Sequence, residues 1–236
     1  MNTTDKCLAI ITARGGSKRI PRKNIRSFLG KPIMYYSIES ALGASCFDEV
    51  MVSTEDQEIA DIAIEAGAKV PFFRSVDNSN DFTTTADVIN EVLQSYKAMG
   101  KTFDYCCCIY PTAPFVTTEK LQKAYQLMES TGADSVVPIV SFGFPILRSF
   151  RIEDGRLQMN WPEHMNSRSQ DLSPAYHDCG QFYFLKVSVF EQTKKLFNDF
   201  TVPLEMPESE VQDIDNEEDW KIAEIKYTFL QDKSKR

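Results

Sequence analysis

The residues best suited to chemistry lie in a basic, glycine-containing loop, the 13–24 loop, which reads Ala13-Arg14-Gly15-Gly16-Ser17-Lys18-Arg19-Ile20-Pro21-Arg22-Lys23-Asn24. Glycines let backbone N–H groups approach a phosphate closely, and arginine and lysine neutralise its charge. The spacing matches neither a Walker A loop nor the GxGxxG motif of dinucleotide-binding proteins. The loop therefore predicts a site for a multiply charged anion, such as a nucleoside triphosphate.

Charge is unevenly distributed along the chain. The window from Lys6 to Ile38 carries eight basic residues and no acidic one, although the whole chain has 26 Lys and Arg against 34 Asp and Glu. A net charge of −8 argues against a general binder of nucleic acid or of membrane surfaces. A cationic patch on an acidic protein favours one focused anion site over the alternative of a merely solvated basic loop.

Two carboxylates with one residue between them, Asp213 and Asp215, are the candidate metal ligands. In an extended segment such residues point to the same face, so both can serve one Mg²⁺ ion. A magnesium ion can bridge phosphate oxygens. The structural alternative is that Asp215 and Glu218 form a capping box at the start of a helix.

Strands and helices alternate along the chain, which predicts an α/β domain with a largely parallel sheet covered on both faces. In such sheets ligands bind at the carboxyl ends of the strands, which here selects the 13–24 loop, the loop after Tyr110 and the region around Asp213. Apolar runs predict strands, and apolar periodicity predicts helices. The expected strands are 7–13, 50–52, 70–73, 105–110, 135–140 and 182–185, and the expected helices include 59–66, 88–96, 121–128 and 220–227.

Residues 141–180 break this alternation and are rich in Phe, Pro, Arg and Asn. Glu153-Asp154-Gly155-Arg156 predicts a hairpin turn inside this segment. We therefore expect a single domain over 1–236, with 141–180 as an arm. Exposed aromatic residues on the arm would form a patch too apolar for a monomer, so the arm is expected to form a homodimer. The aromatic residues in question are Phe142, Phe144, Phe150 and Trp161.

The cysteines and the first residues predict a cytoplasmic location. No apolar run approaches the roughly 20 residues of a membrane span, and Met1 to Lys6 lack the basic segment of a signal peptide. Three of the six cysteines are consecutive within an apolar stretch, which is typical of buried, reduced thiols. These three are Cys106, Cys107 and Cys108.

The motifs, taken in order, resemble the cytidylyltransferases that activate nonulosonic acids, the sialic acid type. The similarity runs through residues 13–24, 52–56, 67–74, 110–114 and 213–220, and so covers nearly the whole chain. It implies a Rossmann-like, three-layer nucleotidyltransferase fold. It also implies a reaction in which CMP passes from CTP to the anomeric hydroxyl of the sugar acid and pyrophosphate leaves.

Within the family, residues 168–172 and 175–183 resemble the branch that takes pseudaminic acid. Sialic acid members tend to have Gln where this chain has Tyr110, and Asn-Gly where it has Cys179-Gly180. These departures favour pseudaminic acid as the acceptor. N-acetylneuraminic acid and legionaminic acid are the alternative acceptors.

The resemblance also implies the residues of the nucleotide site. Arg14, Ser17 and Lys23 match triphosphate-binding positions, and Asn24 matches a position near the reacting phosphate. Arg14 and Lys23, together with the metal ligands Asp213 and Asp215, are the expected catalytic residues, and Mg²⁺ is the expected cofactor. The expected nucleotide-binding residues are Ala13, Arg14, Gly15, Gly16, Ser17, Lys23, Asn24, Arg74, Thr84 and Thr85.

The acceptor needs a cation for its carboxylate, and Arg168 is the candidate, unless it forms a surface or interface ion pair instead. Tyr110, His177 and Gln181 are expected to hydrogen-bond the hydroxyl and acylamino groups of the sugar. His177 beside Asp178 has the order of a base and its orienting group, although a structural histidine fits equally well.

Two other classes of function remain open at this stage. One is a non-catalytic nucleotide-binding protein with the same fold, against which the charged residues of the predicted site argue. The other is a dinucleotide-dependent dehydrogenase, which the missing GxGxxG motif disfavours.

Overall fold

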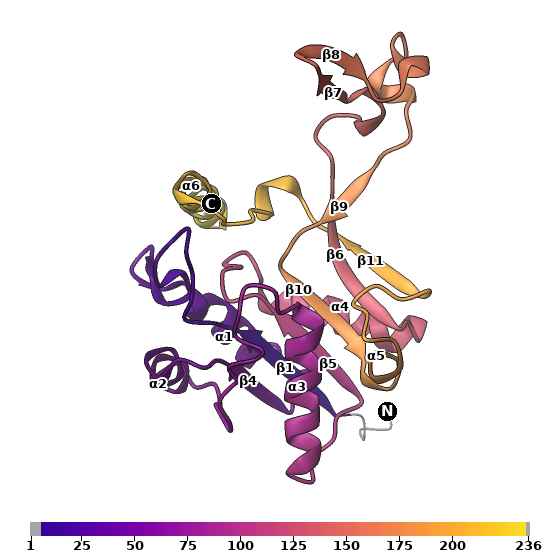
Figure 1. Ribbon diagram of the computed structural model, residues 1–236. Helices are drawn as coiled ribbons and strands as arrows, with labels where there is room; N and C mark the ends of the chain where they lie inside the picture. The colour runs from indigo at the N-terminus through magenta and orange to yellow at the C-terminus, as the bar shows by residue number, and fades with distance from the viewer. Residues whose placement is uncertain (1–5, 235–236) are drawn as a thin grey trace.

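The computed structural model describes residues 6–234, and its centre is a seven-stranded mixed sheet (Figure 1). Five strands share one direction, whereas β10 and β9 run antiparallel to their neighbours. The α/β prediction is therefore confirmed. Along the sheet the order is β11 (Thr201–Glu205), β6 (Ser135–Ser141), β10 (Phe182–Lys186), β5 (Tyr105–Ile109), β1 (Cys7–Thr12) and β4 (Glu49–Ser53), and β9 (Tyr176–Asp178) pairs with β6.

Helices cover both faces of the sheet, because successive side chains of a buried strand point to opposite faces. Ala9 and Ile11 of β1 pack in a cluster with residues of α1, α2 and α4, whereas Leu8 and Ile10 pack with residues of α3 and α5. The result is the expected three-layer arrangement. The first layer contains α1 (Ile33–Gly43), α2 (Gln57–Glu65) and α4 (Thr118–Thr131), and the other contains α3 (Thr85–Ala98) and α5 (Val187–Thr193).

The three consecutive cysteines lie in β5 as expected. Cys106, Cys107 and Cys108 are fully buried, and all six cysteines of the chain are free thiols. Burial raises the pKa of the Cys106 thiol, so it stays protonated and packs as a small apolar group.

One strand prediction is wrong. The segment 70–73 forms no strand, and the chain touches the sheet edge here only through a single bridge between Lys69 and Met51. Pro71 has no N–H with which to extend the ladder beyond that bridge.

The part of the 141–180 segment between β6 and β9 forms an arm that projects from the sheet, whereas β9 itself returns to pair with β6 (Figure 1). Its hairpin pairs β7 (Phe150–Glu153) with β8 (Arg156–Met159), and the turn falls at Asp154 and Gly155. Both turn residues have positive φ, 52° and 70°, which suits a two-residue hairpin turn and the preference for Asp-Gly there. Phe144 is 87% exposed, and Phe142 and Phe150 are also exposed, whereas Trp161 is half-buried.

The last helix, α6 (Glu217–Ser234), packs against the 13–24 loop. Trp220 packs in one cluster with Ile20 and Phe28, with 5.5 Å between the Phe28 and Trp220 ring centroids. This packing places the 213–216 segment beside the basic loop. No helix in the described residues is long and apolar enough to cross a membrane.

The remaining elements are short, and Met1 to Asp5 lie outside the described residues. They are β2 (Ser27–Phe28), β3 (Lys31–Pro32) and the 3₁₀ turns η1 (Lys23–Ile25), η2 (Ile146–Arg148), η3 (Pro162–His164), η4 (Ser169–Asp171) and η5 (Glu208–Glu210).

A buried carboxylate, Glu49, ties α3 to β4 at the end of the sheet away from the 13–24 loop. Its side chain is 4% exposed; Tyr96 and Lys101 donate hydrogen bonds to it, and Lys69 Nζ lies 2.9 Å from Oε2. Burial acts to raise the pKa of Glu49, but the hydrogen bonds from Lys101, Tyr96 and Lys69 outweigh it and hold the pKa at about 2.

Glu49→Gln is expected to lower the free energy of unfolding at pH 7 by about 2 kcal/mol, because it removes the charge that these donors share. The folded pKa lies below the ordinary value of 4.5, so this stabilisation is complete above pH 4.5 and fades as the pH falls towards 2. Urea denaturation of both proteins at pH 7 and pH 3.5 measures it. A difference between the two proteins that did not shrink at pH 3.5 would contradict the assignment.

Candidate active site

Two cavities open at the carboxyl edge of the parallel strands, and Tyr110 lines both. The first has a volume of about 430 Å³ and is lined by the 13–24 loop, by the segment 78–85 and by Asp215. The second has a volume of about 590 Å³ and is lined by residues at the base of the arm, by Asp213 and by Lys226. The three regions that the sequence selected therefore meet at one edge.

Gly15 and Gly16 have different structural surroundings. The N–H of Gly15 donates to Glu55 Oε1 at 2.7 Å, and a Cβ at position 15 would lie 2.5 Å from Asp56 Oδ2. At Gly16 nothing lies within 4 Å of an added Cβ. A Cβ at position 15 would thus press against Asp56 at the start of α2, whereas the space beside Gly16 is open.

Asn24 holds the loop from inside. It is 5% exposed, and its Nδ2 donates to the backbone oxygen of Arg14 at 2.8 Å. The Asn24 side chain thus fixes the position from which Arg14 extends towards the cavity.

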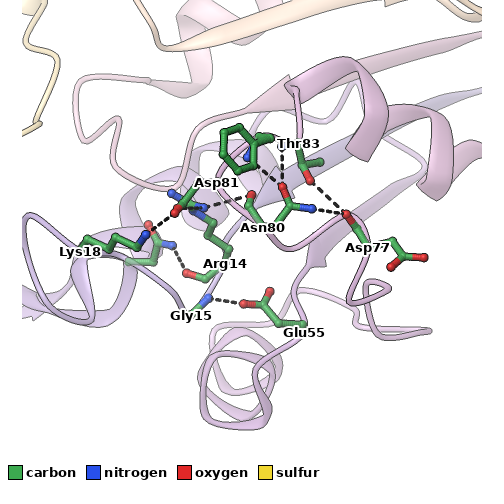
Figure 2. A network of polar contacts seen from close by, with 10 residues as sticks. Arg14, Gly15, Lys18, Glu55, Asp77, Asn80, Asp81 and Thr83 are labelled. Atoms are coloured by element: carbon green, nitrogen blue, oxygen red, sulfur yellow. Dashed lines mark hydrogen bonds and ion pairs between the residues drawn. The ribbon is translucent and has the colours of Figure 1, made fainter.

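The cations of the 13–24 loop are paired with protein oxygens. Arg14 bonds Asp81 Oδ1 at 2.8 Å, and Lys18 bonds the other oxygen of the same carboxylate (Figure 2). On the other side of the cavity, Arg19 bonds Asp215 Oδ1 at 2.7 Å. The loop therefore carries concentrated positive charge that the protein itself balances with carboxylates.

Lys23 is the most enclosed of the cations that the 13–24 loop contributes to the first cavity. Its Nζ donates to the backbone oxygen of Ile214 at 2.6 Å and lies 3.9 Å from Asp215 Oδ1. Burial lowers the pKa of Lys23, while the nearby Asp215 and Asp213 act in the opposite direction. The lysine joins the 13–24 loop to the segment that carries both candidate metal ligands.

The opposite wall of the first cavity is polar and built around the start of α3. Thr84 caps this helix in a reciprocal pair with Asp87, and Thr85 Oγ1 lies 3.0 Å from the Tyr110 hydroxyl. Arg74 also lines the cavity but is 7% exposed, and its Nε donates to Ser53 Oγ at 3.0 Å. Burial lowers the pKa of Arg74.

The second cavity is lined by a hydrogen-bonded carboxylate, Asp178, which the sequence offered only as a possible orienting group for His177. Asp178 accepts hydrogen bonds from the Tyr183 hydroxyl and from the Gly180 N–H, the latter at 2.9 Å. His177 Nδ1 lies 2.9 Å from the backbone oxygen of Asp178 rather than from its carboxylate. Of the two interpretations left open for His177, the structure therefore does not show the pairing with the Asp178 carboxylate.

Two of the expected acceptor-binding residues do not line either cavity. Arg168 lies on the arm with its side chain 71% exposed, and its Nε bonds Asp171 at 2.7 Å. Gln181 is 1% exposed, and its Nε2 donates to the backbone oxygen of Glu210 at 2.7 Å, which fastens the segment before Asp213. Tyr110 and His177 do line the second cavity.

The structural alternative for Asp215, a capping box with Glu218, is not what the structure shows, because the next residue, Asn216, caps the helix. Asn216 Oδ1 accepts from the N–H groups of Glu218 and Asp219, and Asp219 Oδ2 accepts from the N–H of Asn216 at 3.1 Å. The Asp215 carboxylate is therefore free of capping and faces the 13–24 loop. Burial and the neighbouring Asp215 raise the pKa of Asp213.

This pair of carboxylates fits a magnesium ion. Magnesium is held by oxygen ligands, usually one or two carboxylates together with substrate phosphates and water. A cation would also relieve the repulsion between Asp213 and Asp215. Among the described residues, no cluster of three or more His, Cys, Asp or Glu side chains suits a metal ion held by protein alone.

Several lining residues went unassigned in the sequence. In the first cavity, Lys18 and Arg19 were visible as charge, but Asn80 and Asp81 lie in a loop with no motif. In the second cavity, Tyr183 lies in a segment that was compared only with the family, and Lys226 lies on the last helix with no motif around it. The unassigned residues are Lys18, Arg19, Asn78, Asn80, Asp81, Tyr183 and Lys226.

Comparison with known proteins gives consistent matches. Residues 8–201 match the family model described as cytidylyltransferase. A pseudaminic acid cytidylyltransferase of Campylobacter jejuni is 40% identical over 94% of this chain and 96% of that protein. A CMP-N,N'-diacetyllegionaminic acid synthase of Legionella pneumophila is 32% identical over 93% of this chain and 95% of that protein.

Among solved structures, a CMP:2-keto-3-deoxy-manno-octonic acid synthetase complexed with CTP has a similar fold. The TM-score is 0.68 at 16% sequence identity, over 96% of this chain and 99% of that one. This likeness supports the fold assignment.

The two glycines should respond differently to substitution. Gly15→Ala is expected to destabilise the protein by about 1–2 kcal/mol, because the new Cβ displaces Asp56 from the start of α2 and from Arg22. Gly16→Ala should change the free energy of unfolding by less than about 0.5 kcal/mol. Chemical denaturation of both variants tests the contrast, and equal effects would refute it.

Proposed function

Because the chain belongs to the cytidylyltransferase family, we propose that it transfers CMP from CTP to a nonulosonic acid, with pseudaminic acid as the preferred acceptor. The observation that carries the proposal is the pair of cavities at one sheet edge, one rich in cations and the other reached across Tyr110. The 40% identity to a pseudaminic acid cytidylyltransferase over nearly the full length supports this acceptor. So does Tyr110, which stands where sialic acid members tend to have Gln.

The reaction requires an anomeric hydroxyl to attack the α-phosphorus of CTP. An O–P bond forms to the sugar, the bond between the α-phosphorus and the bridging oxygen breaks, and pyrophosphate leaves with that oxygen. The hydroxyl proton is released. Two anionic substrates must therefore be held together, and the charge on the reacting phosphate must be stabilised.

In this proposal the 13–24 loop receives the triphosphate. Arg14, Ser17 and Lys23 bind phosphate oxygens, and Gly16 gives the phosphates access to the backbone. The Lys23 side chain extends from this loop to the backbone oxygen of Ile214, so it is placed to stabilise charge at the reacting phosphate. The N-terminus of α3 and Thr83 to Thr85 receive the cytidine, and Arg74 braces that wall.

Asp213 and Asp215 are the proposed magnesium ligands. When bound there, Mg²⁺ supplies positive charge for the phosphate oxygens and helps to orient them. Asp215 lies beside the cation-rich cavity and Asp213 beside the second one, so the pair stands between the two substrates.

The second cavity is the proposed acceptor site. Tyr110 and His177 line it and are proposed to hydrogen-bond the sugar. Gln181 is buried behind the wall, and its proposed role is to hold the segment that leads to Asp213. Lys226 also lines the cavity, and its Nζ already donates to the backbone oxygen of Val211 at 2.7 Å.

We further propose a homodimer formed through the arm, in a cytoplasmic setting that suits six free thiols. Phe144, Ile152 and Leu157 expose apolar surface on the arm and would be covered by a second copy. Arg168 lies on this arm, remote from both cavities of its own chain. Its carboxylate-binding role therefore requires that the arm reach the acceptor site of the partner.

Pyrophosphate release from CTP and Mg²⁺ tests the function, with pseudaminic, N-acetylneuraminic and legionaminic acid assayed in parallel. Turnover is expected with pseudaminic acid, and Arg14→Ala should lower kcat/KM by about 10²-fold or more because it removes a donor to the phosphates. Lys123→Ala, an exposed lysine on α4, is the matched control and should retain activity. Faster turnover with one of the other two acids would contradict pseudaminic acid as the preferred acceptor. No pyrophosphate release with any of the three acids would contradict the proposed function.

Light scattering tests the dimer. The native protein should have twice the mass of one chain, and Ile152→Asp combined with Leu157→Asp should shift it towards the monomer, because buried charges oppose association. A native protein with the mass of a single chain would contradict the proposal.

A further inference from the structure

One carboxylate, Asp81, occupies the position between two cations of the 13–24 loop (Figure 2). Its Oδ1 lies 2.8 Å from Arg14 Nη1, and its Oδ2 accepts from Lys18. All three side chains line the first cavity, and the carboxylate is 40% exposed. Both cations pull the pKa of Asp81 below its ordinary value, so it is ionised at neutral pH. Arg14, which is proposed to bind phosphate, and its neighbour Lys18 thus already pair with an anion.

Asp81 lies at the tip of a loop, residues 75–84, whose base is fastened to α3. At the base, Ser75 N–H donates to Glu91 Oε1 of α3 at 2.6 Å, and Asn78 also bonds this carboxylate. Asn80 shapes the tip by accepting from the N–H groups of residues 82 and 83. In the described residues, the hydrogen bonds from this tip to the 13–24 loop all involve Arg14 or Lys18.

We propose that Asp81 is a built-in counter-anion that fills the phosphate position of the empty protein and is displaced when a polyphosphate binds. The inference rests on the proposed function, in which Arg14 binds phosphate, and it adds Lys18 as a second phosphate-binding cation because Lys18 lines the same cavity. Asp81 competes with the ligand because it is tethered beside the two cations. Its displacement also breaks two of the contacts between the 75–84 loop and the 13–24 loop and leaves the hydrogen bond from Arg14 to the backbone oxygen of Asn80.

The competition follows from simple linkage. A tethered group acts at an effective concentration in the millimolar range. A ligand with a single anionic group therefore competes poorly with Asp81 for the two cations. A triphosphate prevails because it adds contacts to Ser17, Lys23 and the backbone beside Gly16. Every anion that uses Arg14 and Lys18 must displace the same carboxylate, so Asp81 weakens all of them by one common factor.

Calorimetric titration of Asp81→Asn with CTP, tripolyphosphate and pyrophosphate measures that factor. Each ligand should bind about three- to tenfold more tightly than it binds the native protein, as expected for a partly exposed pair with two cations. Asp77→Asn is the matched control, because it removes one charge from the same loop. Only the backbone oxygen of Asp77 takes part in the contacts around Asn80 (Figure 2).

The outcomes separate this inference from the proposed function. Tighter binding of all three anions by Asp81→Asn, with Asp77→Asn unchanged, supports the counter-anion. Weaker or unchanged binding by Asp81→Asn, in a protein whose native form binds CTP, overturns it and leaves the function standing. An equal gain in both variants also overturns it, since general charge would then explain the effect. A native protein that binds none of the three anions overturns both.

Discussion

The rest of the site depends on one electrostatic constraint: a short, strongly cationic loop must find its counter-charges in distant parts of the chain. Asp81 is 67 residues from Arg14, and Asp215 is 196 residues from Arg19, yet both carboxylates meet the 13–24 loop across the first cavity. Folding therefore brings together three segments that have no local reason to associate. The cavity between them is left polar, cationic and lined by groups that a polyphosphate can use.

The sheet and α6 supply the geometry that this constraint requires. Parallel strands end at one edge, so the 13–24 loop after β1 and the segment that starts at Tyr110 after β5 lie side by side. Trp220 of α6 packs against the cluster that holds Ile20, and Asn216 caps the helix just after Asp215. Tyr110 lines both the cavity proposed for the nucleotide and the cavity proposed for the acceptor, so the two proposed substrates would lie side by side.

Much of the fold could be predicted because its signals are local. Buried strands are short apolar runs, α4 ends at Gly132 with a φ of 69°, and Asp154-Gly155 forms the expected hairpin turn. Helix α1 gave no such signal, since Ile33, Met34, Tyr36, Ser37 and Ile38 are all buried and leave no polar face. The antiparallel direction of β10 could not be predicted either, because its apolar run reads the same in both directions. At the site, residue types indicated the cations and the acidic pair, but only tertiary structure shows that Asp81 balances Arg14, that Gln181 is buried, and that Arg168 lies away from both cavities.

A structure determined with CTP and Mg²⁺ bound tests the central claim most directly. The account predicts the triphosphate on Arg14 and Lys18 of the 13–24 loop, the cytidine against residues 83–85, and the acidic pair at 213 and 215 close to the phosphates. Nucleotide bound elsewhere, or bound with the Arg14–Asp81 and Lys18–Asp81 pairs intact, would contradict it.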